Sequence, residues 1–81
     1  MVRVIVEREF EQPVTFEEIQ EQETRKISCL KLRGVRFVQS FFSHDRRRMI
    51  CEYDAPDAES VREAQTRAGM PFTRVWAAKV L

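Results

Sequence analysis

The stretch GVRFVQSFFSHDRRRMICEYDAP, residues 34–56, contains the features that decide the fold. Residues 35–42 are rich in aromatic and β-branched side chains, and residues 48–54 alternate between apolar and polar, both of which are typical of strands. Between them, Ser43 to Arg46 supply turn residues, because Ser and Asp side chains bond to their own local backbone. The stretch therefore predicts two antiparallel strands joined by a tight loop of two or four residues.

The pairing of these two strands determines which side chains share a face of the sheet. A four-residue loop places Val38, Ser40 and Phe42 opposite Tyr53, Cys51 and Met49, in that order. It leaves a second set on the reverse face: Phe37, Gln39, Phe41, Ile50 and Glu52. Both faces of the predicted hairpin thus carry large apolar groups.

The segments around the hairpin predict one more strand and one helix on each side. Residues 2–8, VRVIVER, alternate as a strand, with Val2, Val4 and Val6 on one face and Ile5 on the other. Thr15 and Glu18 form a capping box, which predicts a helix of roughly 16 residues ending near Gly34.

The C-terminal third begins with helix signals and ends with a strand pattern. Asp57 is a good N-cap for a short helix over residues 58–68, and Gly69 with Pro71 marks its end. Residues 72–81 then read as a last strand. The order β-α-β-β-α-β predicts a single α+β domain over residues 1–81 with the ferredoxin-like sandwich fold. Right-handed crossovers place both helices on one face of a four-stranded antiparallel sheet.

The reverse face of that sheet has no helix to cover it. We expect Phe37, Phe41, Ile50 and Trp76 to lie there with Ile5 and to form an exposed apolar patch. Such a patch usually marks an interface. The simplest cover is a second copy, so the sequence predicts a homodimer with these four large residues at the interface.

Composition narrows the classes of partner and the expected location. The chain has 81 residues, 14 basic and 13 acidic, and its net charge of +1 gives no general attraction to nucleic acid or membrane. The N-terminus lacks the apolar segment of a signal peptide, and no run approaches a membrane span of about 18 apolar residues. We expect a cytoplasmic protein in which the two cysteines are free thiols.

Two further binding readings rest on local sequence. Bases gather between residues 25 and 48, which leaves a basic patch open beside the simpler reading of a solvated hairpin tip. Residues 33–40, RGVRFVQS, echo the signature strand of RNA-recognition domains, but Val35 and Ser40 replace two stacking aromatics and the segment falls on the second strand instead of the third. We therefore do not expect nucleic-acid binding.

A longer pattern resembles one known family. The chain carries SFFSHDRR at residues 40–47, then CEYDAPD at 51–57, Val61-Arg62, and Gly69-Met-Pro71-Phe72. This pattern is similar to that of a family of small bacterial proteins, first described as a domain of unknown function and later named for a nickel-binding member. The resemblance extends over essentially the whole chain and implies a ferredoxin-like fold, a dimeric α+β barrel and nickel as the cofactor.

Nickel takes imidazole, carboxylate and thiolate ligands. The single histidine, His44, excludes a site built from several histidines of one subunit, although a two-fold axis would supply two. The candidate metal ligands are His44 and Asp45 in the turn and Cys51 and Glu52 on the next strand. The alternatives are an exposed turn for the first pair and a buried free thiol for Cys51 and Cys29.

No set of residues has a spacing that specifies catalysis, and we assign no catalytic residue. Glu7, His44, Glu52 and Tyr53 could serve acid–base chemistry, but no pair of them is fixed by spacing. A non-enzymatic, homodimeric, divalent-metal-binding protein is the favoured function. The alternative is a dimeric barrel that binds or transforms a small organic ligand between its sheet and its helices.

Overall fold

The computed structural model describes the backbone of residues 1–81 and the side chains of residues 1–22 and 30–81. The elements follow in the order β1 (Val2–Glu9), α1 (Phe16–Leu32), β2 (Arg36–Phe42), β3 (Arg48–Ala55), α2 (Ala58–Arg67) and β4 (Arg74–Ala78). The predicted order β-α-β-β-α-β is therefore confirmed. The prediction that Cys29 is a buried free thiol falls on a side chain outside the described set.

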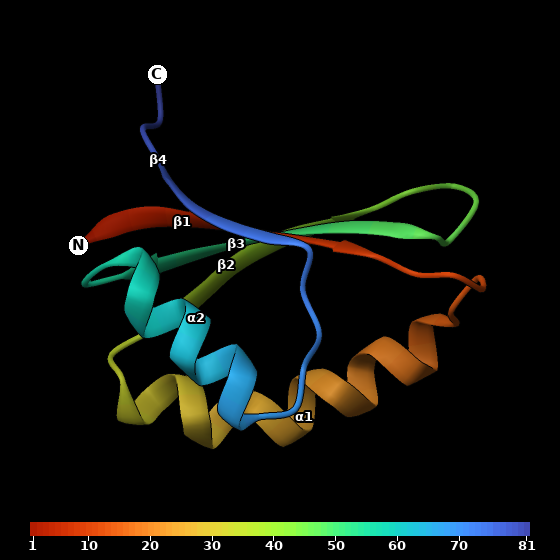
Figure 1. Ribbon diagram of the computed structural model, residues 1–81, viewed down its shortest axis with the longest axis horizontal. Helices are drawn as coiled ribbons and strands as arrows, with labels where there is room; N and C mark the ends of the chain where they lie inside the picture. Colours follow the sequence, from red (N-terminus) through yellow and green to blue (C-terminus); the bar gives the residue numbers. More distant parts are fainter.

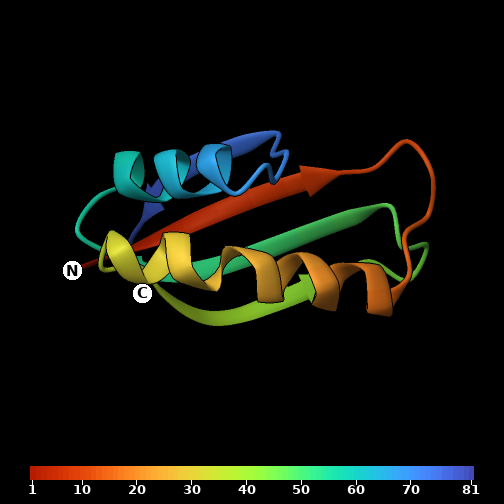
Figure 2. The same ribbon diagram turned by 90° about the horizontal axis from the view of Figure 1, so that it is seen from below.

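The four strands form one antiparallel sheet in the order β2-β3-β1-β4. Figure 1 shows both helices on the same side of this sheet, and Figure 2 shows α1 and α2 lying next to each other across it. This arrangement is the ferredoxin-like α+β fold, as predicted. It leaves the other side of the sheet, the reverse face, without a covering element.

Local chemistry explains where the helices begin and end. The Thr15 hydroxyl accepts from the Glu18 N–H at 3.2 Å, and the Glu18 carboxylate accepts from the Thr15 N–H at 2.8 Å, which completes the capping box. Asp57 caps α2 by accepting from the Ser60 N–H at 2.7 Å. Gly34 and Gly69 follow the two helices at φ of +67° and +70°, the left-handed conformation that favours glycine.

The core lies between the sheet and the helices. Val4 and Val6 of β1 are fully buried on this side, together with Cys51 and Tyr53 of β3 and Val61 of α2. Their alternation agrees with the faces predicted for β1. Ile19 and Leu30 of α1 are buried in this core, whereas Phe16 in the first turn of the helix is 62% exposed.

The hairpin confirms part of the predicted pairing and corrects the rest. The Ser43 N–H donates to the Arg48 carbonyl, so the loop between these two residues has four residues, 44–47. Phe42 pairs with Met49 and Ser40 with Cys51, as predicted. A bulge between Phe37 and Gln39 then shifts the register, so that Phe37 instead of Val38 lies opposite Tyr53. The Phe37 ring packs edge-on against Tyr53 at 5.8 Å between centroids. The placement of Phe37 on the reverse face was therefore wrong. The bulge adds an extra residue to β2, so the residues on the side of the bulge away from the loop are shifted by one position and face the other way.

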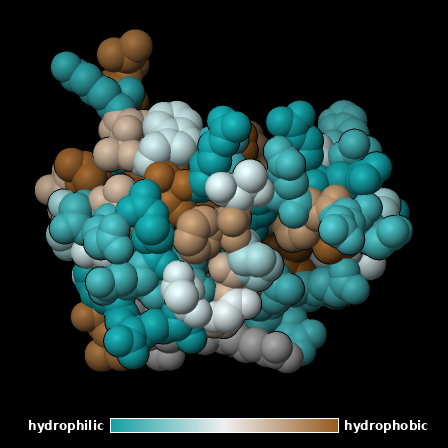
Figure 3. Space-filling view, viewed as in Figure 1, coloured by the Kyte–Doolittle hydropathy of each residue, from teal (hydrophilic) through white to brown (hydrophobic). Residues whose placement is uncertain are grey.

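Strand β4 is shorter than the predicted strand of residues 72–81. The last residue of β4, Ala78, pairs with Arg3 of β1, and β1 begins one residue before Arg3, at Val2. Residues 79–81 thus extend beyond the end of the sheet, and Figures 1 and 3 show the chain end projecting from the body of the molecule.

A buried polar cluster ties β1 to α2 on the helix side of the sheet. Arg8 is only 2% exposed; its guanidinium donates to the Gln65 side-chain oxygen at 2.6 Å and to the Pro71 carbonyl at 2.7 Å. The Gln65 amide in turn donates to the Tyr53 hydroxyl at 3.3 Å. These contacts attach the loop between α2 and β4 to the sheet.

Candidate binding site on the reverse face of the sheet

The reverse face is built by the alternate side chains of all four strands. Three rows of cross-strand neighbours cross it, each given from β4 through β1 and β3 to β2: Arg74, Glu7, Ile50 and Phe41; Trp76, Ile5, Glu52 and Gln39; and Ala78, Arg3, Asp54 and Arg36. Because paired residues of antiparallel strands point to the same side, these twelve side chains form one surface.

One part of this surface is apolar. Phe41, Ile50 and Trp76 are 55%, 40% and 46% exposed, while Ile5 is nearly covered by its neighbours. Phe41 and Trp76 lie on the two edge strands, β2 and β4, and Ile50 lies on β3 between them. We call Phe41, Ile50 and Trp76 the apolar strip.

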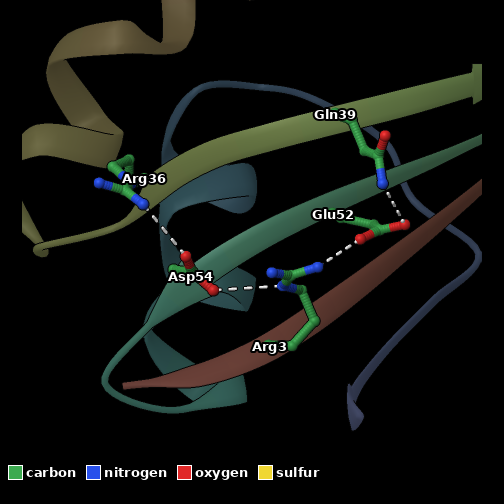
Figure 4. A network of polar contacts seen from close by, with 5 residues as sticks. All are labelled: Arg3, Arg36, Gln39, Glu52 and Asp54. Carbon is green, nitrogen blue, oxygen red and sulfur yellow. Dashed lines mark hydrogen bonds and ion pairs between the residues drawn. The ribbon is translucent and has the colours of Figure 1, made fainter. Parts of the chain in front are cut away.

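Another part of the surface is a charged network that one chain completes by itself (Figure 4). Arg3 donates to Glu52 at 2.6 Å and to Asp54 at 3.2 Å, and Arg36 approaches Asp54 at 3.5 Å from β2. The Gln39 amide also donates to Glu52, at 3.2 Å. These hydrogen bonds, first to Asp54 and then to Glu52, raise the pKa of the Arg3 guanidinium above its ordinary value. The network thus satisfies both of its carboxylates internally.

Glu7 differs from those carboxylates in having a single neutral donor. The Trp76 indole N–H donates to its Oε2 at 2.7 Å, and no other described side chain bonds to Glu7. Arg74 lies opposite Glu7 in the register, but it makes no ion pair with it within the described residues. Glu7 therefore presents a negative charge that the indole orients and does not neutralise.

A depression of about 370 Å³ lies beside Glu7, at the end of the sheet that carries the hairpin loop. Glu7, Glu9, Phe41, Ser43, Arg48 and Ile50 line it, together with Arg8, Phe42 and Met49 that separate them in the chain. The paired residues Phe41 and Ile50 give it an apolar floor, and Glu9 lies opposite Arg48 in the register at its rim. The lining thus combines apolar side chains with charged groups.

The four predicted metal ligands do not come together in one chain. His44 is exposed in the hairpin loop, and Asp45 beside it accepts from the Ser43 hydroxyl at 2.6 Å and the Arg47 N–H at 3.1 Å. These two bonds, in that order, lower the pKa of the Asp45 carboxyl below its ordinary value. Asp45 thus has the turn role that was the alternative to metal binding.

The other two predicted ligands point to opposite sides of the sheet. Cys51 is completely buried in the core, where its sulfur accepts from the Ser40 hydroxyl at 3.4 Å, and Glu52 is held by Arg3 on the reverse face. Consecutive strand residues alternate between faces, so they could not both bind one ion. Within the described part of the chain, no three His, Cys, Asp or Glu residues are grouped to hold a metal ion.

Of the predicted interface residues, Phe41, Ile50 and Trp76 lie together on the reverse face and Phe37 does not. The sequence reading missed the orientation of Glu7 by Trp76, because those residues are far apart in the chain and only the β1–β4 pairing brings them together. It also missed the burial of Arg8, although the alternation of Val4, Val6 and Arg8 was a usable signal. Among the described residues, no helix is long and apolar enough to cross a membrane.

The fold and its uncovered face define a class: a ferredoxin-like α+β domain with one face of its sheet open to solvent. The sequence model of the family described as nickel responsive protein SCO4226-like matches residues 5–77, and the chain belongs to that family. The resemblance noted from the sequence is thereby confirmed, and it supports a nickel-related role for the protein.

The crystal structure of SCO4226 from Streptomyces coelicolor A3(2) has the same fold, with a TM-score of 0.86, 16% sequence identity and 98% of each chain covered. No curated protein matches the chain.

Proposed function

We propose that this protein is a non-enzymatic homodimer that binds a divalent metal ion, nickel first, with two copies meeting through their reverse faces. The observation that carries the dimer is the apolar strip, which lies on a sheet face that none of the described residues covers. The nickel part is supported by the family to which the chain belongs.

The charged network is compatible with burial of this face. Removing charges from water is costly unless each charge is paired and hydrogen-bonded. Arg3, Glu52 and Asp54 already pair within one chain, so a second copy could cover them without having to supply partners. The same face therefore combines an apolar strip that gains from burial with charges that tolerate it.

A two-fold axis would also address the shortage of ligands. One chain has one histidine and no described group of three metal-binding side chains, whereas a dimer doubles every donor. His44 is exposed, and imidazole is a ligand that nickel favours. We therefore propose a metal site shared between copies, with His44 as one ligand from each.

Native mass spectrometry with and without added nickel tests both parts. We expect a dimer that takes up nickel in a fixed ratio, and a His44→Ala dimer that binds nickel at least tenfold more weakly by calorimetry, because each copy loses a ligand. The matched control is Gln12→Ala, an exposed side chain in the loop between β1 and α1. Unchanged affinity in His44→Ala would remove His44 from the site, and a wild-type dimer that takes up no nickel would contradict metal binding.

A second candidate function, binding of a small organic ligand, is favoured by the depression beside Glu7. We infer that such a ligand would lie on the reverse face, since the depression with an apolar floor lies there. This location differs from the space between sheet and helices, where Tyr53, Cys51 and Val61 are fully buried.

A further inference from the structure

We propose that the depression beside Glu7 binds an organic cation, a molecule with an ammonium or amidinium group on a small apolar body. The Glu7 carboxylate would hold the cation while Phe41 and Ile50 contact the apolar body. This inference rests on the second candidate function and adds the chemical class of the ligand.

The charges that line the depression favour a cation. Glu7 and Glu9 in the lining are negative and Arg48 is positive, while Arg74, on the same face opposite Glu7, is not part of the lining. Arg8, although it is part of the lining, directs its guanidinium to Gln65 and Pro71 on the helix side. Acids therefore outnumber bases among the lining residues whose charge faces the depression. Neither Arg48 opposite Glu9 nor Arg74 opposite Glu7 makes an ion pair with these carboxylates within the described part of the chain.

The carboxylate is held in place before any ligand arrives. The Trp76 indole N–H donates to Oε2 of Glu7 at 2.7 Å, which fixes the side chain on the surface and leaves Oε1 without a partner among the described side chains. A carboxylate oriented by a neutral donor keeps its full charge, in contrast to Glu52 and Asp54, which are paired with Arg3. Holding the group in its binding orientation lowers the entropic cost of recognition.

The apolar floor distinguishes an organic cation from a bare ion. Phe41 and Ile50 are cross-strand partners on the floor, and both are substantially exposed. Contact with an apolar body would remove their surface from water, which favours binding. The volume of about 370 Å³ falls within the range of about 300–1,000 Å³ found for small-molecule sites.

The test compares three probes of similar shape and different charge: 2-phenylethylammonium, 2-phenylethanol and 3-phenylpropionate. Trp76 is the single tryptophan of the chain, so its indole N–H signal in an NMR spectrum reports on the neighbour of Glu7. We expect the ammonium probe to shift this signal in a saturable way. The alcohol and the carboxylate should bind at least tenfold more weakly, because the alcohol forms no charge-assisted hydrogen bond with Glu7 and the carboxylate is repelled by it.

Two variants that each remove one negative charge test whether binding of the ammonium probe depends on Glu7. Glu7→Gln should weaken binding of the ammonium probe by about tenfold or more, whereas Glu11→Gln, an exposed residue in the loop after β1, should leave it unchanged. A circular dichroism spectrum identical to wild type would confirm that Glu7→Gln is folded. Equal affinity of Glu7→Gln and wild type for the ammonium probe would overturn the proposal.

Other outcomes would distinguish the binding of an organic cation from general small-molecule binding, metal binding and dimerisation. If alcohol and ammonium bound equally well, the depression would be a small-molecule site and the cation class would be wrong. If no probe shifted the signal, the small-molecule function would fail at this site as well. If nickel alone shifted it and Glu7→Gln abolished that shift, the carboxylate would serve the metal; if only dilution shifted it, the occupant would be a second copy.

Discussion

The Arg8 guanidinium lies beneath α2 and bonds to a side-chain amide and a main-chain carbonyl instead of an acid. No carboxylate of the described residues pairs with it, and its Nε is buried without a partner. A buried cation is costly when unpaired, but its long aliphatic stem also fills space in the core. The residue therefore contributes packing and two bonds against a desolvation cost.

Substitutions at Arg8 separate these contributions. Arg8→Ala should lower the free energy of unfolding by about 2–4 kcal/mol through lost packing and lost hydrogen bonds. Arg8→Met should cost less, because it keeps the stem and removes the buried charge. Urea unfolding measures both, with the exposed Arg67→Ala of α2 as a control expected within about 0.5 kcal/mol of wild type. An equal loss in Arg8→Met and Arg8→Ala would contradict a large packing contribution.

At the scale of the elements, the β2–β3 hairpin concentrates most of the unusual local geometry. Its loop places Arg46 at φ +61°, in the left-handed region that glycine occupies at other positions of the chain. The Ser43 hydroxyl and Asp45 carboxylate stabilise this loop through bonds to the N–H groups of Arg47 and Arg48. The loop thus tolerates a strained residue because neighbouring side chains replace the missing backbone partners.

Replacing Arg46 with glycine should relieve this strain and stabilise the folded protein. Arg46→Gly should raise the free energy of unfolding by up to about 1 kcal/mol, because the left-handed conformation costs an L-residue about 1–2 kcal/mol and the added freedom of the unfolded chain returns part of that. Arg46→Ala is the matched control, since it removes the side chain and keeps the strain, and it should stay near wild type. Thermal and urea unfolding of wild type, Arg46→Gly and Arg46→Ala would measure these changes. A less stable Arg46→Gly would show that the strain at Arg46 is negligible.

At the scale of the whole molecule, the two faces of the sheet have different coverings. The helix side is sealed by α1 and α2, and the reverse side exposes the apolar strip next to a completed charged network. Family membership agrees with a nickel-related role. The proposed dimer gives that exposed side a partner.

A lysine in the apolar strip should disrupt such a dimer. Ile50→Lys would place a charge among apolar groups at the proposed interface, and we expect a monomer by light scattering at concentrations where wild type is dimeric. Leu32→Lys makes the same chemical change at an 82% exposed position on α1 and should remain dimeric. A dimeric Ile50→Lys with unchanged dissociation would show that the copies, if they associate, use another surface.

Most of the fold could be read from local sequence because its signals are local. Capping residues, glycines after helices and alternating strands all act within a few residues, and they placed five of the six elements closely; only β4 was clearly overextended. The candidate site could be read only in part. Phe41, Ile50 and Trp76 were placed on the correct face, but one bulge moved Phe37 to the other side, and no spacing shows where a strand accommodates an extra residue.

The sequence by itself determined the order of the elements, the helix on each side of the hairpin and the existence of an uncovered sheet face. The tertiary structure alone decided which side chains meet there. It separated Cys51 from Glu52 onto opposite faces, committed Asp45 to the turn, and joined Trp76 to Glu7 across 69 positions of the chain. The reason is physical: local propensity depends on neighbours in sequence, whereas a binding surface depends on strand register, which is settled only when distant segments pair and bury their apolar sides together.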